Sequence, residues 1–394
     1  MFASRTNWNL KPNHLTEALA RHKSSGRKLL DLSASNPTEC GFHYDAPTIM
    51  RALCNPAALQ YHPDPRGLKS ARQAVSGYYA ACGIHVAVDD LLLTISTSEA
   101  YSYVFRLLCN SGDDLLIPTP SYPLFDFLAD VNDVKLTRYP LFYDHGWHID
   151  LHTLEQAITP RTRGVIVVHP NNPTGHYTKL NELAALNKIC AAHQIAIIAD
   201  EVFLDFSISV TAETTTGAPP ISFASNNQAL TFTTSGISKI SGLPQMKFAW
   251  LAVNGPDDLK REALTRLEFI ADTYLSMSAP IQLAAPALLQ ARGPFQGQIK
   301  ARVRKNLAAL DAQLSRQSHL SRLEVEGGWY AVLRVPATRS DEDLALELLE
   351  RHDVYVHPGH FYDFPGDGYL VVSLITAEPE FSEAIARLLA AGNL

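Results

Sequence analysis

Residues 235–250 read SGISKISGLPQMKFAW and follow an apolar, β-rich run at residues 229–234. Small residues, among them Gly236 and Ser238, surround Lys239 in this stretch. A lysine amine at the end of a buried strand, among small side chains rather than carboxylates, is placed to be partly neutral and nucleophilic. Such lysines form Schiff bases with carbonyl compounds. A surface lysine in a glycine- and serine-rich loop is the ordinary alternative, and the remaining stretches of the chain decide between the two.

Short apolar runs alternate with helix-like segments from Leu91 to Val253. This alternation predicts βαβ units and a mainly parallel sheet flanked by helices, so we expect an α/β fold. Ligands of such sheets bind outside the carboxyl ends of the strands. Polar or aromatic candidates follow five of the apolar runs, and we expect them to gather at one edge of the sheet: Ser98, Tyr122, Asn172, Asp200 and Lys239.

These five stretches, in this order, resemble the motifs of the fold-type I pyridoxal-phosphate enzymes, the aspartate aminotransferase superfamily of class I/II. The family has a Ser-x-x-Lys motif with a phosphate-binding arginine eight residues later. Lys239 matches its lysine, whereas Gly236 stands where the serine is usual, with Ser235 one place earlier, and Lys247 stands where the arginine is usual. Its most specific short motif is matched by Asn172-Pro173-Thr174-Gly175, and its Pro-x-Tyr-Pro turn is matched at Tyr122. The resemblance implies a pyridoxal-phosphate-dependent transferase fold.

The resemblance also implies a role for each matched residue around the cofactor ring. Lys239 would hold pyridoxal 5'-phosphate as a Schiff base, and Asp200 would pair with the protonated pyridine nitrogen. Asn172 would donate to the phenolic oxygen, and Tyr122 would stack on the ring. Phe203 stands where tyrosine is usual, so a second hydroxyl donor to the phenolic oxygen is expected to be absent.

For the cofactor phosphate, the resemblance points to the helix start at Thr97 and Ser98 and to Lys247. A helix start exposes free N–H groups and the positive end of the helix dipole, which suits a phosphate. Tyr61 matches the tyrosine that reaches the phosphate of the neighbouring subunit, which implies a homodimer. Ser238, beside Lys239, completes the expected cofactor-binding set.

The substrate side of the expected site is less regular. The loop at Ser35, Asn36 and Pro37 resembles one that lines the substrate cleft, and Tyr274 and Ser276 resemble groups contributed by a partner subunit. Family members usually have an arginine, which grips the substrate carboxylate with two hydrogen bonds, where this chain has Val371. An apolar side chain does not replace that fork. Another cation (Arg66 or Arg334), backbone groups, or a substrate that is not an ordinary α-amino acid are the three alternatives.

The length of 394 residues suits one large and one smaller domain. We expect a large cofactor-binding domain at residues 46–285. Residues 1–45 and 286–394 are expected to form an N-terminal arm and a small α+β domain, with a helix at 298–314 and strands at 323–326 and 329–335.

The overall composition indicates which kinds of partner and which cellular compartment to expect. A formal net charge of −7 gives no reason to expect nucleic acid or an anionic membrane as a partner, so small molecules are the expected ligands. Five scattered cysteines without a CxxC pair fit reduced thiols in the cytoplasm, and no secretion signal or membrane span is expected. His357 and His360 have no third ligand in sight, so no metal site is expected.

The sequence therefore predicts an aminotransferase of amino acid metabolism that moves an amino group between an amino acid and a 2-oxo acid by a ping-pong mechanism. Three alternatives stay open. One is a pyridoxal-phosphate lyase, decarboxylase or racemase on the same fold, and another is a catalytically retired binding or regulatory protein. The third is an α/β enzyme with another cofactor, which the lack of a nucleotide-binding glycine fingerprint disfavours.

Overall fold

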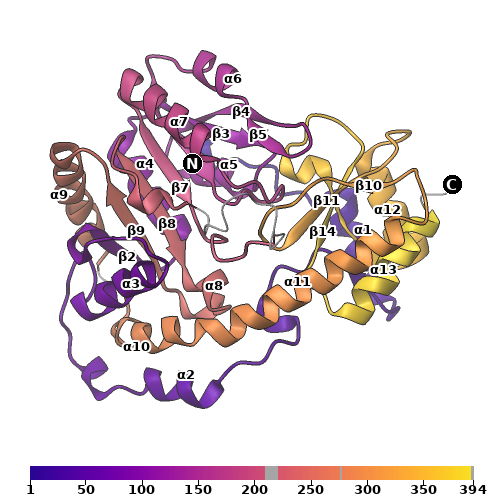
Figure 1. Ribbon diagram of the computed structural model, residues 1–394, viewed down its shortest axis with the longest axis horizontal. Helices are drawn as coiled ribbons and strands as arrows, with labels where there is room; N and C mark the ends of the chain where they lie inside the picture. The colour runs from indigo at the N-terminus through magenta and orange to yellow at the C-terminus, as the bar shows by residue number, and fades with distance from the viewer. Residues whose placement is uncertain (209–220, 276, 392–394) are drawn as a thin grey trace.

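A large mixed sheet forms the centre of the computed structural model, which describes residues 1–208, 221–275 and 277–391 (Figure 1). Its strands lie in the order β2-β9-β8-β7-β6-β3-β4-β5. Their bounds are β2 Leu91–Thr94, β3 Asp114–Thr119, β4 Lys135–Tyr143, β5 Trp147–Ile149, β6 Thr162–Val168, β7 Ala196–Asp200, β8 Thr231–Gly236 and β9 Ala249–Asn254. The five strands from β8 to β4 are parallel, whereas β9 and β5 are antiparallel to their neighbours. The predicted α/β fold with a mainly parallel sheet is confirmed.

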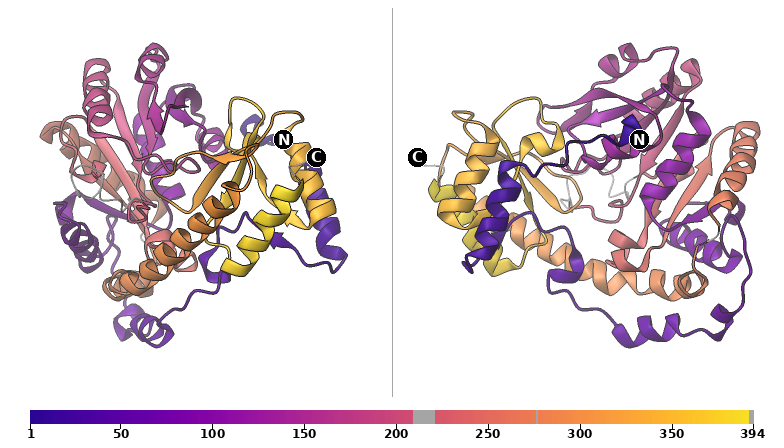
Figure 2. Two further views of the ribbon diagram at one scale, coloured as in Figure 1. Left: turned by 45° about the vertical axis from the view of Figure 1, so that its right-hand side comes forward. Right: turned by 180° about the vertical axis from the view of Figure 1, so that it is seen from behind.

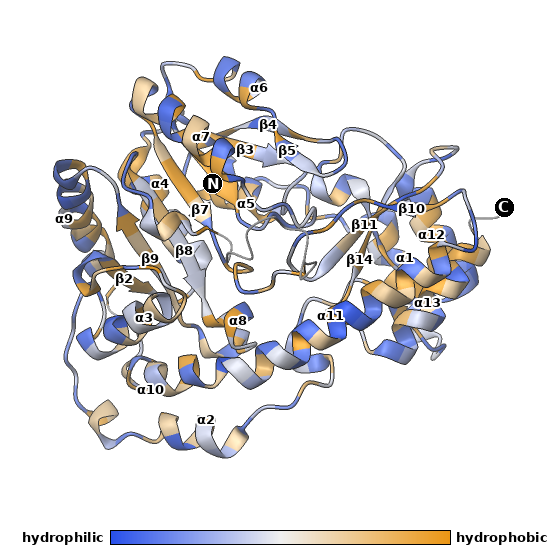
Figure 3. Cartoon of the chain, viewed as in Figure 1, coloured by the Kyte–Doolittle hydropathy of each residue, from blue (hydrophilic) through white to orange (hydrophobic). Residues whose placement is uncertain are grey.

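Helices cover both faces of this sheet, as its continuous apolar strands require. Alternate residues of β6 point to opposite faces, so Ile166 packs in one core and Val165 in another. On the Ile166 face lie α4 (Thr97–Leu108), α5 (Leu124–Val131) and α9 (Asp257–Tyr274). The hydropathy colouring in Figure 3 shows that β7, at the centre of this sheet, is an apolar strand.

The remaining helices lie on the other face, along the edge, or in the smaller part of the molecule. Their bounds are α1 His14–Ser24, α2 Ala46–Leu53, α3 Lys69–Ala81, α6 Leu151–Gln156, α7 Leu180–His193, α8 Ile237–Ile240, α10 Ala279–Gln290, α11 Arg292–Leu314, α12 Asp341–His352 and α13 Glu378–Ala391. Among the described ranges, no helix combines the length and the apolar character that a membrane span requires.

A second, antiparallel sheet forms the smaller part, in the order β10-β11-β14-β13. Its strands are β10 Ser321–Arg322, β11 Tyr330–Arg334, β13 His357–Pro358 and β14 Tyr369–Ser373, while β1 (Leu30–Asp31) pairs with β12 (Val354–Tyr355) in a separate two-stranded sheet. The strand predicted at residues 323–326 is wrong. The chain leaves the ladder there, because the Glu326 carbonyl accepts from the Ile208 backbone N–H at 2.8 Å, in the larger part.

The long helix α11 runs from the large sheet to the small one (Figures 1 and 2). Phe295 near its start and Leu310 near its end belong to one buried cluster, which also contains residues of both sheets. Because one core crosses between the two parts, the domain limits at residues 46 and 285 stay a prediction.

The N-terminal segment also connects the two parts (Figure 2, right). Trp8 donates from Nε1 to Oδ2 of Asp130 at 2.7 Å, beside α5, and its ring packs edge-on against Phe127. Further along, α1 packs on α12, and β1 pairs with β12 in the smaller part. Residues 1–31 are therefore attached at both ends.

Candidate active site

Lys239 lies on α8, a single helical turn at the end of β8 (Figure 1). Gly236 precedes this turn, in close contact with β9. A Cβ at this position would lie 2.9 Å from Cβ of Ala249 and 3.0 Å from the carbonyl oxygen of Phe248. The close approach of these two strands explains why glycine stands where the resemblance leads one to expect serine.

The amine of Lys239 lies among aromatic rings. Its Nζ is 5.6 Å from the ring centroid of Phe203 and 5.2 Å from that of Trp329. Burial lowers the pKa of Lys239 to about 8, and the nearby carboxylate of Asp200 opposes this shift. A substantial fraction of the amine is therefore neutral, and so nucleophilic, near neutral pH.

Asp200 ends β7 with only 9% of its surface exposed. Its Oδ2 accepts from the Tyr101 hydroxyl at 3.0 Å, and its Oδ1 accepts from the Val202 backbone N–H at 3.0 Å. Burial raises the pKa of Asp200 to about 6, while these hydrogen bonds and Lys239 act in the opposite direction. The site thus holds a carboxylate whose ionised form is only partly compensated, which suits a cationic ligand group.

Asn172 and Tyr122 lie in loops that follow β6 and β3. The amide Oδ1 of Asn172 is buried and has no hydrogen-bond partner among the described residues. A buried amide oxygen without a partner is unusual in a folded protein. Tyr122 is 44% exposed, and the surrounding protein and the charge of Asp200 both raise the pKa of its hydroxyl.

The residues expected at the cofactor phosphate are more dispersed. Thr97 and Ser98 form the first turn of α4, which is capped by Ser96 through its Oγ and the Glu99 backbone N–H at 3.1 Å. Both are half-buried, as is Ser238 beside Lys239. Lys247 is exposed in a left-handed backbone conformation with φ 50°, and Tyr61 is 75% exposed. This chain alone does not bring Lys247 or Tyr61 into contact with Lys239.

On the substrate side, the loop of Ser35, Asn36 and Pro37 begins a 3-10 turn capped by Asn36, whose Oδ1 accepts from the Thr38 backbone N–H at 3.2 Å. Ser35 and Asn36 line a surface pocket with Cys40 and Thr376.

Neither candidate arginine is placed beside Val371: one is paired with a glutamate, and the other is exposed at a strand end. Arg66 donates from Nε to Oε2 of Glu268 at 2.8 Å. Arg334 is exposed at the end of β11, four residues and roughly 13 Å from Tyr330 along the strand.

Tyr274, one of the two residues expected to act in a partner subunit's site, packs against Tyr103 and below the Arg106 guanidinium. Ser276 lies outside the described residues.

Val371 is 1% exposed on β14 and pairs with Val332 on β11 and with His357 on β13. Residues directly opposite in an antiparallel pair share a face, and so do alternate residues of one strand. Tyr330 and Ser373 therefore lie on the same face as Val371.

Three residues that lie close to the predicted site residues were not predicted from the sequence. Tyr101 holds Asp200, while Trp329 and Tyr330 stand at the start of β11 close to Lys239 and Tyr122 respectively. Tyr101 lies three residues after Ser98, on neighbouring positions of one helix. That spacing was the only sequence signal available for it.

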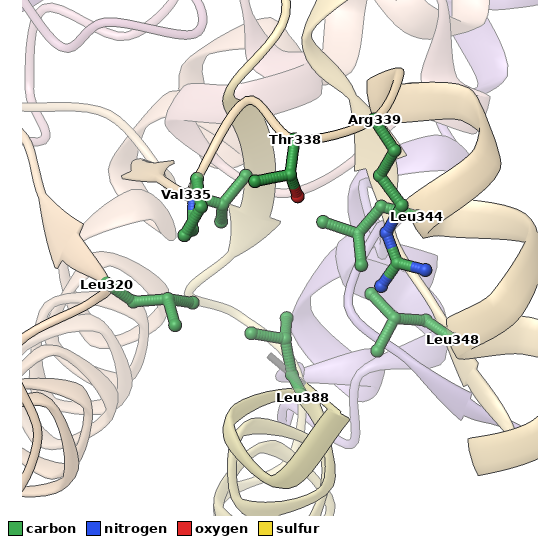
Figure 4. A pocket seen from close by; sticks show the side chains of 8 residues that line it. Leu320, Val335, Thr338, Arg339, Leu344, Leu348 and Leu388 are labelled. Carbon is green, nitrogen blue, oxygen red and sulfur yellow. The ribbon is translucent and has the colours of Figure 1, made fainter. Parts of the chain in front are cut away.

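An apolar pocket of the smaller part lies away from this site (Figure 4). It is lined by Leu320, Val335, Pro336, Thr338, Arg339, Leu344, Leu348 and Leu388. Arg339 forms an ion pair with Glu347, so the only cation of this lining is already compensated. The pocket contains none of the predicted site residues.

Comparison with known proteins places these features in a family. The description "Aminotransferase class I and II" matches residues 27–388. The chain is 32% identical over 270 residues to the glutamate-pyruvate aminotransferase AlaA of Escherichia coli K12, a match that covers 68% of this chain and 65% of that protein's length. It is 28% identical over 382 residues to the alanine aminotransferase of Mycobacterium tuberculosis H37Rv, covering 94% and 86% of the two chains.

Solved structures show the same fold. The alanine aminotransferase of Pyrococcus furiosus superposes with a TM-score of 0.88 at 21% identity and with full coverage of both chains. An aminotransferase of E. coli gives 0.85 at 24% identity and covers 100% of this chain and 98% of the other.

The side chains described above fit the cofactor of this family, pyridoxal phosphate. A buried, partly neutral amine suits its aldehyde, a buried carboxylate suits its pyridine nitrogen, and Asn172, in the loop that follows the neighbouring strand β6, offers an amide N–H for its phenolic oxygen. By its sequence and its fold, this chain belongs to the class I and II aminotransferases.

Proposed function

We propose that the protein is a pyridoxal-phosphate-dependent aminotransferase that moves an amino group between an amino acid or related amine and a 2-oxo acid in two half-reactions. The observation that carries this proposal is the buried Lys239 amine, whose pKa is lowered to about 8, with the Asp200 carboxylate beside it. An amine and a carboxylate held in one desolvated site are the pair that this chemistry needs.

Pyridoxal phosphate, when bound, supplies the electron sink that makes bonds to the amine-bearing carbon labile. Lys239 provides the amine that binds the cofactor aldehyde, and after its release it moves the proton at the amine-bearing carbon of the substrate. Its neutral fraction accepts the proton, and its low pKa lets it return that proton near neutral pH.

The surrounding residues orient the ring. Asp200, held by Tyr101, would keep the pyridine nitrogen protonated, and Asn172 would donate to the phenolic oxygen. Tyr122 would hold the ring by stacking, and Phe203, which lies beside Lys239, offers no hydroxyl. Ser238 and the α4 start, at Thr97 and Ser98, provide donors for the phosphate, together with the exposed Lys247.

A homodimer in the cytoplasm is part of the proposal. The segment between α2 and α3 runs along the outside of the molecule (Figure 1) and exposes Leu59 by 92% and Tyr61 by 75%. Apolar side chains this exposed support burial by a second copy, with Tyr61 reaching that copy's phosphate site. The five cysteines are all free, which supports a reducing compartment.

The test is a half-reaction. Purified holoenzyme is mixed with one amine at a time, without a 2-oxo acid, and the visible absorption of the bound cofactor is followed. We expect at least one amine to remove the band and pyruvate or 2-oxoglutarate to restore it, whereas a Lys239→Ala variant shows neither change.

Loss of carbon dioxide or of a substrate side chain, without transfer to an added 2-oxo acid, would contradict the proposal in favour of a lyase or decarboxylase. A coloured protein that no amine alters would support a catalytically retired binding protein.

A further inference from the structure

The face of the small sheet that carries Val371 turns toward the predicted catalytic residues. Tyr330 lies on this face, and the hydroxyls of Tyr122 and Tyr330 are close enough for one to raise the pKa of the other. Tyr362 is near enough to Tyr122 and Tyr330 for them to raise its pKa, and its hydroxyl lies 3.1 Å from Nδ1 of His357. The ring centroid of Tyr330 lies 6.4 Å from that of Phe203, which in turn lies 5.6 Å from Nζ of Lys239, so this face of the small sheet approaches the site of Lys239. We call Val371, Tyr330, His357 and Tyr362 the Val371 wall.

The Val371 wall carries no positive charge. Burial lowers the pKa of His357, against a smaller opposing effect of Asp31, so its imidazole is neutral at neutral pH. Asp200 is the charged group beside Lys239 and Tyr122, and within the described part of the chain no lysine or arginine donates a hydrogen bond to the hydroxyl of Tyr330 or of Tyr362, whose hydroxyl faces His357.

One further cation in the smaller part is engaged with other groups. Arg302, whose charge acts on Cys40, donates to the Ile375 carbonyl at 3.2 Å and pairs with Glu378 at 3.5 Å. Residues 209–220, 276 and 392–394 contain no lysine, arginine or histidine. A carboxylate placed against the Val371 wall would therefore lose its hydration without gaining a cation from this chain, which is strongly unfavourable.

We propose that this site selects an amino donor that is uncharged at the end facing the Val371 wall: a primary amine without a carboxylate on its amine-bearing carbon, with an aryl or alkyl group in that place. The aromatic rings of Phe203, Trp329 and Tyr330 provide the surface for such a group. The neutral His357–Tyr362 pair offers hydrogen bonds to an uncharged oxygen at its end, such as a phenol.

The exchange balances without a further reactant. The amine-bearing carbon of the donor is oxidised by two electrons to a carbonyl and gives up its nitrogen, while the carbonyl carbon of the acceptor gains two electrons and takes that nitrogen. Because the carboxylate of a 2-oxo acid acceptor would face the same uncharged Val371 wall, such an acceptor should have a higher KM than the matched aldehyde. This inference rests on the proposed amino transfer and specifies its donor.

The test compares donors that differ only by the carboxylate. Phenethylamine is paired with phenylalanine, and tyramine with tyrosine, and the rate at which each removes the visible cofactor band is measured with wild-type holoenzyme. We expect kcat/KM for the amine to exceed that for the amino acid by about 10- to 100-fold, the equivalent of one or two missing hydrogen bonds to a charged group. An amino acid that reacts faster than its matched amine overturns the inference while leaving amino transfer intact, whereas failure of every donor overturns the proposed function instead.

A pair of variants localises the effect. Val371→Arg supplies the missing cation and should reverse or reduce the preference for the amine by tenfold or more. Val371→Leu adds bulk without charge and should retain the preference. If Val371→Arg folds and binds cofactor but leaves the preference unchanged, the Val371 wall does not contact that end of the substrate and the inference fails. If Val371→Arg does not fold, the comparison of amines with amino acids on the wild-type enzyme still tests the inference.

Discussion

Replacing Asp200 with asparagine should make the cofactor-free protein more stable at neutral pH, although it removes a group proposed to act on the cofactor. Burial raises the pKa of Asp200 from 3.8 to about 6. An acid whose pKa is higher in the folded state binds protons more tightly there, so it destabilises the fold as the pH rises from about 4 to about 6. A shift of about 2 units corresponds to about 3 kcal/mol above pH 6. Asparagine has the same shape without the charge: its Oδ1 can accept from the Val202 backbone N–H, and its Nδ2 can donate to the Tyr101 hydroxyl oxygen.

The assay is urea unfolding of the two cofactor-free proteins, followed by tryptophan fluorescence at pH 4 and pH 7.5. We expect Asp200→Asn to gain about 1–3 kcal/mol in the free energy of unfolding at pH 7.5, since weaker hydrogen bonds to the amide offset part of the relieved charge. At pH 4 the carboxyl is mostly protonated, and the two proteins should differ by less than about 1 kcal/mol. A variant that is less stable at pH 7.5, or a difference that is the same at both pH values, would refute the reasoning.

Three further predictions test other parts of the site. Because the pKa of Lys239 is about 8, the rate at which the cofactor-free protein binds pyridoxal phosphate should rise about fivefold between pH 7 and pH 8 with the neutral amine, and a flat stopped-flow profile would contradict this. Tyr61→Ala and Lys239→Ala should each be inactive, yet co-refolded mixtures should regain activity, because a hybrid dimer contains one site with both residues. No recovery in verified hybrids would exclude a role for Tyr61 across subunits. Gly236→Ser should lower the free energy of unfolding by about 1–3 kcal/mol because its Cβ meets Ala249, and an unchanged urea midpoint would show that the strands can separate.

Local sequence patterns were sufficient to predict the strands that position the site. The apolar runs that became β6 and β7 are buried on both faces, so their composition is nearly continuous, and Asp200 marks the end of one of them. The sequence of β8 likewise ends just before Lys239. These positions follow from strand burial alone, and the roles of the side chains stay predictions.

The surroundings of Lys239 could not be read in the same way. Trp329 is 90 residues away along the chain, and its approach depends on how the small sheet packs against the large one. The wrong strand at residues 323–326 has the same origin, because Leu323 still donates to Val332 of β11, whereas the Glu326 carbonyl accepts from Ile208 in the larger part. Long-range contacts of this kind have no local sequence signal.

The attachment of the N-terminal segment at both ends limits how far the two parts of the molecule can separate. Trp8 is fixed beside α5, and α1, which begins at His14, is fixed on α12. Residues 9–13 lie between these anchors, so six steps along the chain join Trp8 to His14 and reach at most about 21 Å when fully extended. Any hinge motion that separates the two parts of the molecule therefore has a fixed upper bound, set by a short length of chain that lies outside the proposed site.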